Sequence, residues 1–242
     1  MTAKFKVGDL VTLITHPLFD NARVKGDGKY IPPIMIIKEV FVEDKKKRIF
    51  SEETGKKIAD NIKYKTLFFD DNKSEFVEST IYQTMLRTFE ELIIERIDKK
   101  GNTEDIKDKL VDEINNYPRV EYDYGKIVRF KTKKIEIYKK RSSKRIPAKE
   151  DKILKEKIKE IVQYVVNYTS PDFIISGYKL NEETNLYFPN GNEKRLVSME
   201  LLKVQWFNPI QMKFSEQYLP IECFTDSMNL SEVDNNKKNH SK

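Results

Sequence analysis

Cysteine and histidine are scarce in this sequence. Its 242 residues include one cysteine, Cys223, and two histidines, His16 and His240. A single cysteine excludes an intrachain disulfide framework, and three such residues are too few for a four-ligand zinc site. They also provide no well-placed histidine for a Ser-His-Asp triad. We therefore predict no bound metal, no catalytic residues and a protein that is not an enzyme.

Glycine is scarce as well, with eight residues, and long apolar runs are absent. Gly26, Gly55 and Gly125 fit neither GxGxxG nor GxxxxGK[ST], so we predict no nucleotide cofactor of those two kinds and no other cofactor. The longest apolar stretch, 31–37, contains two prolines and is far shorter than the ~20 residues of a membrane-spanning helix. The N terminus lacks the apolar segment of a secretion signal. We expect a cytoplasmic protein with no membrane partner.

The chain matches itself when it is shifted along its own length. At an offset of 138 residues, 33–86 align with 171–224 without a gap, with nine identical pairs in 54 positions. At an offset of 117 residues, 5–13 align with 122–130, so the second copy carries 21 extra residues, which fall within 131–170. The matched residues are mostly apolar ones that would face a core. The sequence therefore predicts an internal duplication.

Each repeat has the pattern of five short strands separated by turn residues, with a glycine before the first strand. The order VGDLVTL, IMIIKEV, KYKTLFFD and EFVESTIYQTML resembles small bacterial SH3-like proteins of the YodC-like kind. Thr66 and Val204 occupy the positions where such proteins often have cysteine. The resemblance implies an SH3-like barrel. Related barrels of the Tudor and KOW types bind nucleic acid or protein segments rather than catalyse reactions.

Helical spacing of apolar residues predicts three helices outside the barrels, within 87–100, 103–114 and 148–168. We therefore predict an α+β, mainly β fold: two duplicated five-stranded SH3-like barrels joined by a helical linker, with a helical insertion in the second. The predicted parts are barrel 1 (1–86), the linker (87–118), barrel 2 (119–225) with its insertion (131–170), and a disordered tail (226–242). The broad apolar face of the third helix, which includes Ile158, Val162 and Val165, is predicted to bind a partner or a second copy in a homodimer.

Lysine and arginine are concentrated in one segment of the chain. Residues 126–149 contain eleven of them and one acid, Glu136, so the segment carries +10 while the whole chain carries +6. A surplus of this density favours a polyanion such as DNA or RNA over an ordinary solvated surface. We expect a strand over 126–140 and a loop over 141–149. The predicted nucleic-acid-binding residues are Arg129, Lys131, Lys133, Lys134, Lys139, Lys140, Arg141, Lys144, Arg145 and Lys149.

Aromatic residues supply a second candidate surface. Trp206, Phe207 and Tyr218 lie on the predicted closing hairpin of the second repeat, where Tudor-like barrels can hold a cation or a peptide. Because Trp206 and Phe207 are neighbours on a strand, one of the two must face the core. We predict these three residues as partner-binding.

These features favour a non-catalytic accessory protein that helps a nucleic-acid-processing complex to hold DNA or RNA. A bacterial phage-defence or CRISPR effector nuclease is the example that we favour. The first alternative is a pure protein-interaction module that makes no nucleic-acid contact. The second is a metal-dependent nuclease. Pro171-Asp172 could begin a PD-(D/E)xK site, but no (D/E)xK follows it. The runs Glu150-Asp151-Lys152 and Asp105-Ile106-Lys107 have that spacing, but they lie at predicted helix starts, where acids have a capping role.

Overall fold

The computed structural model describes residues 2–16, 31–43, 60–88, 94–97, 103–106, 119–146, 155–168 and 170–226. For 94–97, 103–106, 133–146 and 155–168 the structure describes the backbone alone. The strands are β1 (Leu10–Leu13), β2 (Met35–Val42), β3 (Ile62–Asp70), β4 (Glu75–Tyr82), β5 (Leu86–Thr88), β6 (Ile94–Ile97), β7 (Thr103–Ile106), β8 (Ile127–Phe130), β9 (Lys133–Ile146), β10 (Lys155–Tyr168), β11 (Phe173–Leu180), β12 (Arg195–Val197), β13 (Glu200–Asn208), β14 (Lys213–Pro220) and β15 (Phe224–Thr225). Two single-turn 3₁₀ helices, Gln83–Met85 and Ile221–Cys223, precede β5 and β15.

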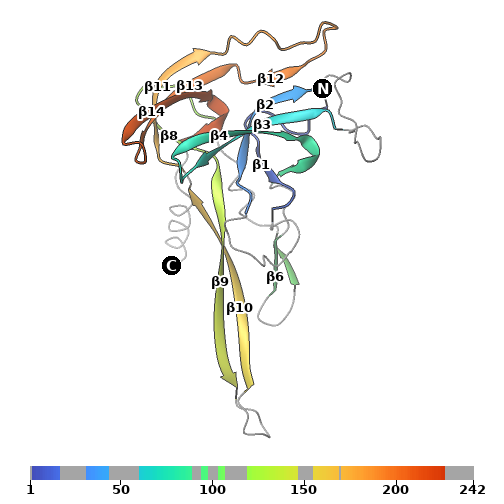
Figure 1. The fold of residues 1–242 in the computed structure, drawn as a ribbon, viewed down its shortest axis with the longest axis vertical. Helices are drawn as coiled ribbons and strands as arrows, with labels where there is room; N and C mark the ends of the chain where they lie inside the picture. Colours follow the sequence, from blue (N-terminus) through green and yellow to red (C-terminus); the bar gives the residue numbers. More distant parts are fainter. Residues whose placement is uncertain are drawn as a thin grey trace, which may run out of the picture.

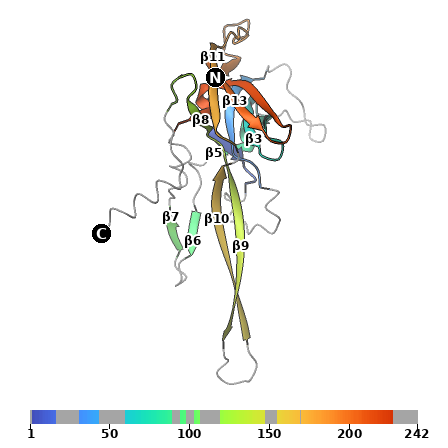
Figure 2. The ribbon, with the colours of Figure 1, turned by 90° about the vertical axis from the view of Figure 1, so that its left-hand side faces the viewer.

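Two antiparallel sheets form the body of the molecule, and two separate strand pairs extend from it (Figure 1). The first sheet has the order β4-β3-β2-β1-β5, and β12 from the C-terminal half of the chain pairs with β2. The second sheet has the order β14-β13-β11-β8-β15. The remaining strands pair as β9 with β10 and β6 with β7, and both pairs lie on the same side of the body (Figure 2).

The two sheets repeat each other at the offsets seen in the sequence. The strands β2, β3 and β4 reappear 138 residues later as β11, β13 and β14, and β1 reappears 117 residues later as β8. Even the irregularities recur, because the bulge between Ile37 and Glu39 has its counterpart between Ile175 and Gly177. The predicted repeat is therefore present in the described backbone.

A glycine with a left-handed backbone precedes the first strand of each repeat. Gly8 has a φ of +92° and Gly125 a φ of +82°, and their amides donate to the carbonyls of Ile37 and Ile175 at 2.9 Å in both repeats. The turn thus fixes the start of β1 against β2 and of β8 against β11, which favours glycine because a Cβ is disfavoured at positive φ.

We expect the two glycines to tolerate alanine unequally. A Cβ on Gly8 would lie 2.8 Å from the Cβ of Glu222, whereas a Cβ on Gly125 would meet nothing within 4 Å. Gly125→Ala therefore adds only backbone strain, about 1 kcal/mol, and Gly8→Ala adds a clash for a total of about 3 kcal/mol. Urea unfolding of both variants measures the difference, and equal losses would contradict the structure.

The core sits where the two sheets pack on each other. Alternate residues of each strand lie on opposite faces of its sheet, and we name these faces by their residues. In the first sheet the inner face carries Met35 and Tyr64, and the outer face carries Ile36 and Phe69. The inner and outer faces of the second sheet carry the residues at the matching positions of repeat 2. The outer face of the first sheet packs on the inner face of the second, and together they form one cluster. That cluster contains Leu10, Ile34, Ile36, Leu67 and Phe69 from repeat 1 and Val120, Val128, Phe130, Phe173, Ile175, Leu202, Val204, Trp206, Leu219, Ile221, Cys223 and Phe224 from repeat 2.

Aromatic rings fill the centre of this interface. Phe69 and Phe76 of repeat 1 contact Phe173 and Trp206 of repeat 2 with ring centroids 5.3–6.2 Å apart. The indole Nε1 of Trp206 also donates to the Ser74 carbonyl at 3.1 Å, so the buried N–H is satisfied. The two repeats therefore share this core, and repeat 1 has a second, smaller cluster on its inner face.

The predicted helices and closed barrels were wrong. The described residues contain no α-helix; parts of the expected linker form β6 and β7, and the expected insertion helix forms β10. Neither sheet closes within the described residues, because β4 and β5 end the first and β14 and β15 end the second. The open inner face of sheet 2 is filled by repeat 1 instead. The tail predicted for 226–242 lies beyond Asp226 and therefore outside the described residues.

Candidate nucleic-acid interface

The strands β9 and β10 form a two-stranded ribbon that projects from the body, called the arm below (Figures 1 and 2). All fourteen residues of β9 pair with β10, from Lys133 opposite Tyr168 at the body to Ile146 opposite Lys155 at the far end. At ~3.3 Å per residue the ribbon extends roughly 45 Å. Most of the predicted basic segment therefore lies on a projecting element.

The pairing register distributes the basic residues over the two faces of the arm. Residues directly opposite each other, and every second residue along a strand, share a face. On one face, the far half of the arm has Lys140 opposite Ile161, Ser142 opposite Lys159, Lys144 opposite Lys157 and Ile146 opposite Lys155. This stretch holds five lysines and no acid, and we call it the basic face.

The opposite face of the arm has a different character. In the far half Arg141 is opposite Glu160 and Arg145 is opposite Glu156, so acids offset the arginines. In the half near the body Ile135 is opposite Val166, which makes that part apolar. The two faces of the arm therefore differ in charge over the same length of ribbon.

The predicted helical docking face does not exist in the ribbon. Ile158 and Val162 are opposite Ser143 and Lys139, which places them on one face, whereas Val165 is opposite Glu136 on the other face. The three residues form one stripe at 3.6-residue spacing but separate at two-residue spacing. The prediction of a shared helical surface at these positions was therefore wrong.

Two of the predicted basic residues lie at the base of the arm. The Arg129 guanidinium pairs with Asp172 at 3.1 Å. Lys131 is partly buried, and this burial lowers the pKa of its ammonium from the ordinary value. Lys133, Lys134 and Lys139 are on β9 nearer the body, and Lys149 lies outside the described residues. The predicted residues are thus divided among an ion pair on the body, a partly buried position and the arm.

The three predicted aromatic residues are also separated. Trp206 is 6% exposed and belongs to the shared core, so it does not form a docking surface. Phe207 is on the outer face of sheet 2 and is 45% exposed. Tyr218 is on the same face, with the Lys179 ammonium 4.3 Å from its ring centroid. An internal lysine therefore already occupies the side of Tyr218 where an external cation would bind.

The described residues contain no group of three or more His, Cys, Asp and Glu side chains that could hold a metal ion. His16 is buried, and this burial lowers its pKa to about 4, so it is neutral at pH 7. Cys223 is buried in the shared core, and desolvation raises the pKa of its thiol. Asp172, the acid of the nuclease alternative, forms an ion pair with Arg129. None of the helices in the described part of the chain is long and apolar enough to cross a membrane.

A surface hollow of about 550 Å³ lies on the body, away from the arm residues. Its lining includes Leu180, Met199 and Lys6, together with the ion pair of Arg119 and Glu200. None of the predicted site residues lines it. The hollow therefore adds no member to the arm site.

Sequence reasoning found the lysines and arginines of β9 but missed those of β10. Lys155, Lys157 and Lys159 were assigned to a helix, although their two-residue spacing would have placed all three on one face of a strand. Comparison of the chain with protein-family models, with curated proteins and with solved structures found no match.

Proposed function

We propose that this protein is a non-catalytic, cytoplasmic accessory protein that binds nucleic acid through the basic face of its arm. The observation that supports the proposal most directly is the run of five lysines without an acid on one face of the far half of the ribbon. Phosphates are spaced regularly along a nucleic-acid backbone, and a row of ammonium groups neutralises several of them at once. In this role the body would contact the nucleic-acid-processing complex.

The shape of the arm supports the same proposal. A two-stranded ribbon fits the major groove of duplex DNA, which is ~12 Å wide. The arm extends roughly 45 Å at ~3.3 Å per residue, so the basic face is held away from the two sheets. Binding by a row of lysines contacts phosphates more than base edges. We therefore expect little sequence preference and strong salt dependence.

Neutralising three lysines of the basic face should weaken DNA binding about 100-fold at ~0.1 M salt, because about three phosphate contacts and their released counterions are lost. The variant is K140Q/K144Q/K157Q. The plot of log K against log salt on duplex DNA should become shallower by about 2.7, at about 0.9 per contact. Fluorescence anisotropy with a labelled duplex of roughly 30 base pairs, titrated at several salt concentrations, measures both the affinity and its salt dependence.

The matched control removes three positive charges from the body. Lys6, Lys73 and Lys213 are exposed there, and K6Q/K73Q/K213Q has the same net charge as the arm variant. This control should bind within about 3-fold of the unchanged protein, because distant exposed charges are largely screened beyond ~10 Å at 0.1 M salt. Equal losses in the two variants, or an unchanged salt slope in the arm variant, would refute the proposal.

A protein partner for the arm is the second candidate, and one observation favours it. Near the body, apolar residues face each other across the two strands of the arm: Ile135 is opposite Val166, and Ile137 is opposite Tyr164. A solvated two-stranded ribbon is marginally stable by itself, and a protein partner would cover such residues. In that case I137S/V166S would abolish partner binding while the anisotropy assay shows no DNA binding by the unchanged protein even at low salt.

A further inference from the structure

The outer faces of the two sheets have the same kinds of residue but different surroundings. On sheet 1 this face carries Leu10, Ile36, Phe69 and Phe76, which pack on repeat 2. Their counterparts in repeat 2 are Ile127, Ile174, Phe207 and Phe214, and they are 58%, 49%, 45% and 70% exposed. The same apolar positions are thus buried within the chain in one repeat and open to solvent in the other.

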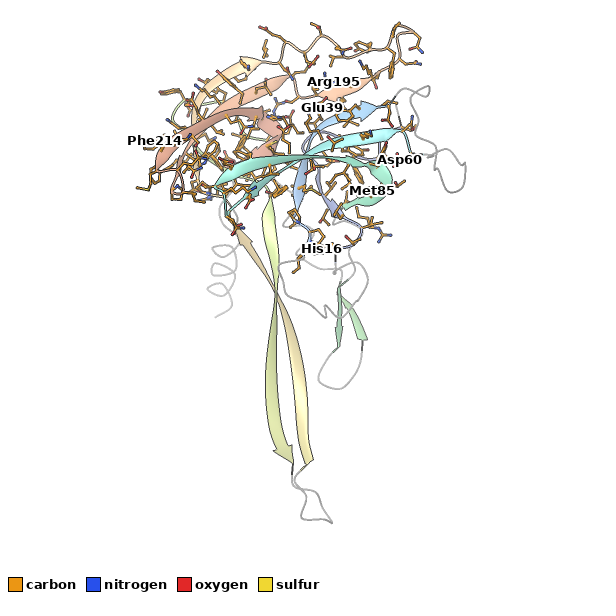
Figure 3. The ribbon with its side chains drawn as sticks, in the orientation of Figure 1. His16, Glu39, Asp60, Met85, Arg195 and Phe214 are labelled. Atoms are coloured by element: carbon orange, nitrogen blue, oxygen red, sulfur yellow. The ribbon has the colours of Figure 1, made fainter. Side chains whose placement is uncertain are left out.

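Four of the exposed positions lie on one face of the second sheet. The pairing register sets Ile127 opposite Ile174 and Phe207 opposite Phe214, all on the outer face of sheet 2. Phe207 and Phe214 also contact each other, with ring centroids 5.5 Å apart. The turn that follows β13 adds Ile210 and Met212, which are 56% and 76% exposed. We call these six residues the apolar patch; Figure 3 labels Phe214 at the edge of the body.

The turn differs between the repeats in a way that fits this exposure. In repeat 1 the positions equivalent to Ile210 and Met212 are Asn72 and Ser74, and the Ser74 carbonyl accepts bonds from Trp206 and Asn208 of repeat 2. That turn is part of the internal interface and is polar. In repeat 2 the Gln211 side chain of this turn donates to the Glu75 carboxylate of repeat 1, whereas the apolar side chains of Ile210 and Met212 are exposed. Exposure to solvent alone would favour polar residues in a turn and does not explain the apolar residues at these two positions.

We propose that the apolar patch is the contact surface of a homodimer, with the patch of one chain covering the patch of a second copy. Within the chain, the outer face of one sheet packs against the inner face of the other. A second copy of the chain cannot repeat this arrangement, because both inner faces are already covered. The inner face of repeat 2 is filled by Phe69 and Phe76, and the inner face of repeat 1 is filled by Phe5, whose ring lies 5.2 Å from that of Tyr64. Two outer faces can therefore meet only each other, which gives a two-fold symmetric contact.

The size of the patch fits a dimer of moderate affinity. With roughly 180 Å² for a large side chain, the six residues at their exposed fractions offer roughly 600 Å² per copy. Two copies then bury roughly 1,200 Å², which is the lower end for specific interfaces. An exposed apolar area of roughly 600 Å² is at the upper end of what monomeric soluble proteins show.

Charges at the border of the patch suit a two-fold contact. The ion pair of Lys203 with Glu216 lies on the same face at one side, and the pair of Arg129 with Asp172 lies at another. Both signs are present at both places, so a rotated second copy can set unlike charges against each other at the rim. The acids also disfavour nucleic acid at this surface.

The dimer is tested by sedimentation equilibrium of the full chain from roughly 5 to 500 µM, around the ~10 µM dissociation constant expected for an interface of this size. Phe214→Glu should raise the dissociation constant by about 30-fold or more, because an exposed aromatic side chain of the contact is replaced by a charge in both copies. Ile127→Lys, at the other end of the patch, should weaken the dimer as well. Both substitutions are at exposed positions, so the thermal unfolding midpoint of the separated chains should stay unchanged.

Met199→Glu is the matched control, because Met199 is 60% exposed but borders the hollow on the body instead of the patch. It should leave the dissociation constant within about 2-fold, as a surface change outside the contact does. A monomeric unchanged protein over the whole concentration range would overturn the proposal. A dimer that survives Phe214→Glu, or that Met199→Glu weakens equally, would overturn it too.

Discussion

Phe173→Ala should lower the free energy of unfolding by about 4 kcal/mol, the largest loss that we expect from a single substitution in this protein. The Phe173 side chain is fully buried, and its ring lies 5.4–5.9 Å from those of Phe69, Phe76, Trp206 and Phe224. Alanine at this position leaves a cavity between the two sheets that rings held from both sides cannot fill. Urea unfolding monitored by circular dichroism measures the loss.

The same substitution tests whether the repeats unfold together. Because the ring belongs to a core made by both repeats, both should lose stability at the same urea concentration. Trp206 is the only tryptophan and lies in that core, so its fluorescence and the circular dichroism signal should change with one midpoint. Two separate midpoints would show that the repeats are independent domains. Tyr187→Ala is the control; Tyr187 is 61% exposed, and its loss should change stability by less than about 0.5 kcal/mol.

The repeat could be predicted because its strands and turns produce short sequence patterns that involve only neighbouring residues. Apolar residues alternate in segments such as 62–70 and 200–208 because successive side chains of a strand point to opposite faces. A glycine precedes the first strand of each repeat because the turn there has a positive φ. These constraints act on neighbouring residues, so a single sequence displays them. The predicted strands that correspond to β1 to β4, and the hairpin turns after Asp70 and Asn208, therefore agree with the structure.

The arm was mispredicted because its two possible structures share one apolar pattern. Ile158, Ile161, Val162 and Val165 fit helical spacing, but β-branched residues favour strands, and β9 offers a partner for every residue of β10. Pairing with β9 is a non-local choice that periodicity in a window cannot detect. The same error placed Lys155 on a helix and hid half of the basic face.

The difference between the two outer faces was not predictable from the sequence. Phe69 and Phe207 are identical residues at matched positions, as are Phe76 and Phe214. Phe69 is 4% exposed and Phe207 is 45% exposed, because repeat 2 covers repeat 1 and the described chain has nothing to cover repeat 2. Which sheet face is covered depends on how the two repeats pack, and no residue pattern within one repeat encodes that. The closed barrels were mispredicted for the same reason.

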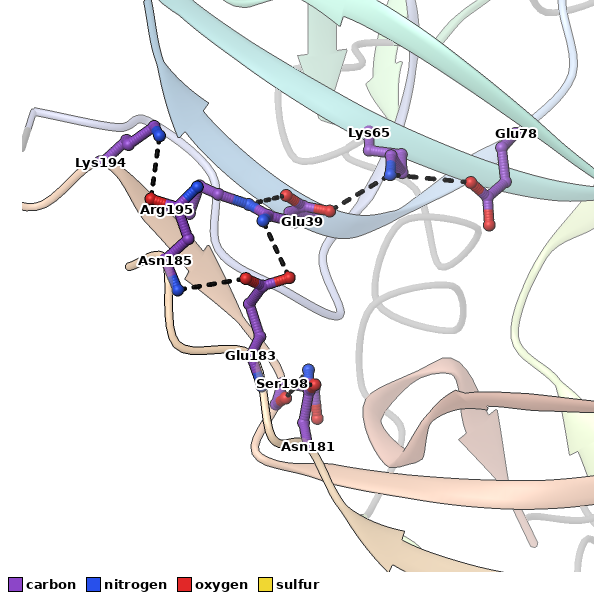
Figure 4. Close-up of polar contacts among 9 residues, drawn as sticks. All are labelled: Glu39, Lys65, Glu78, Asn181, Glu183, Asn185, Lys194, Arg195 and Ser198. Carbon is purple, nitrogen blue, oxygen red and sulfur yellow. Dashed lines mark hydrogen bonds and ion pairs between the residues drawn. The ribbon is translucent and has the colours of Figure 1, made fainter. Parts of the chain in front are cut away.

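Arg195→Ala should cost about 3 kcal/mol, because it removes the main partner of a buried carboxylate. The strand β12 pairs with β2, and at this junction the Arg195 guanidinium reaches Glu39, whose side chain is 7% exposed, at 2.5 Å (Figure 4). The hydrogen bond to Glu39 raises the pKa of Arg195 above its ordinary value. After the substitution, the ion pair with Lys65, at 3.4 Å, is what remains to the Glu39 carboxylate among the described residues.

A double-mutant cycle separates the pair from the strand pairing. Glu39→Gln in the Arg195→Ala background removes the uncompensated charge, so the double variant should recover about 1 kcal/mol or more relative to Arg195→Ala alone. Lys203→Ala is the matched control: it breaks the pair with Glu216, which is 52% exposed, and should cost less than about 1 kcal/mol. If Arg195→Ala and Lys203→Ala cost the same, the ion pair does not secure β12 to β2, and the three backbone-paired positions of β12 hold the strand without it.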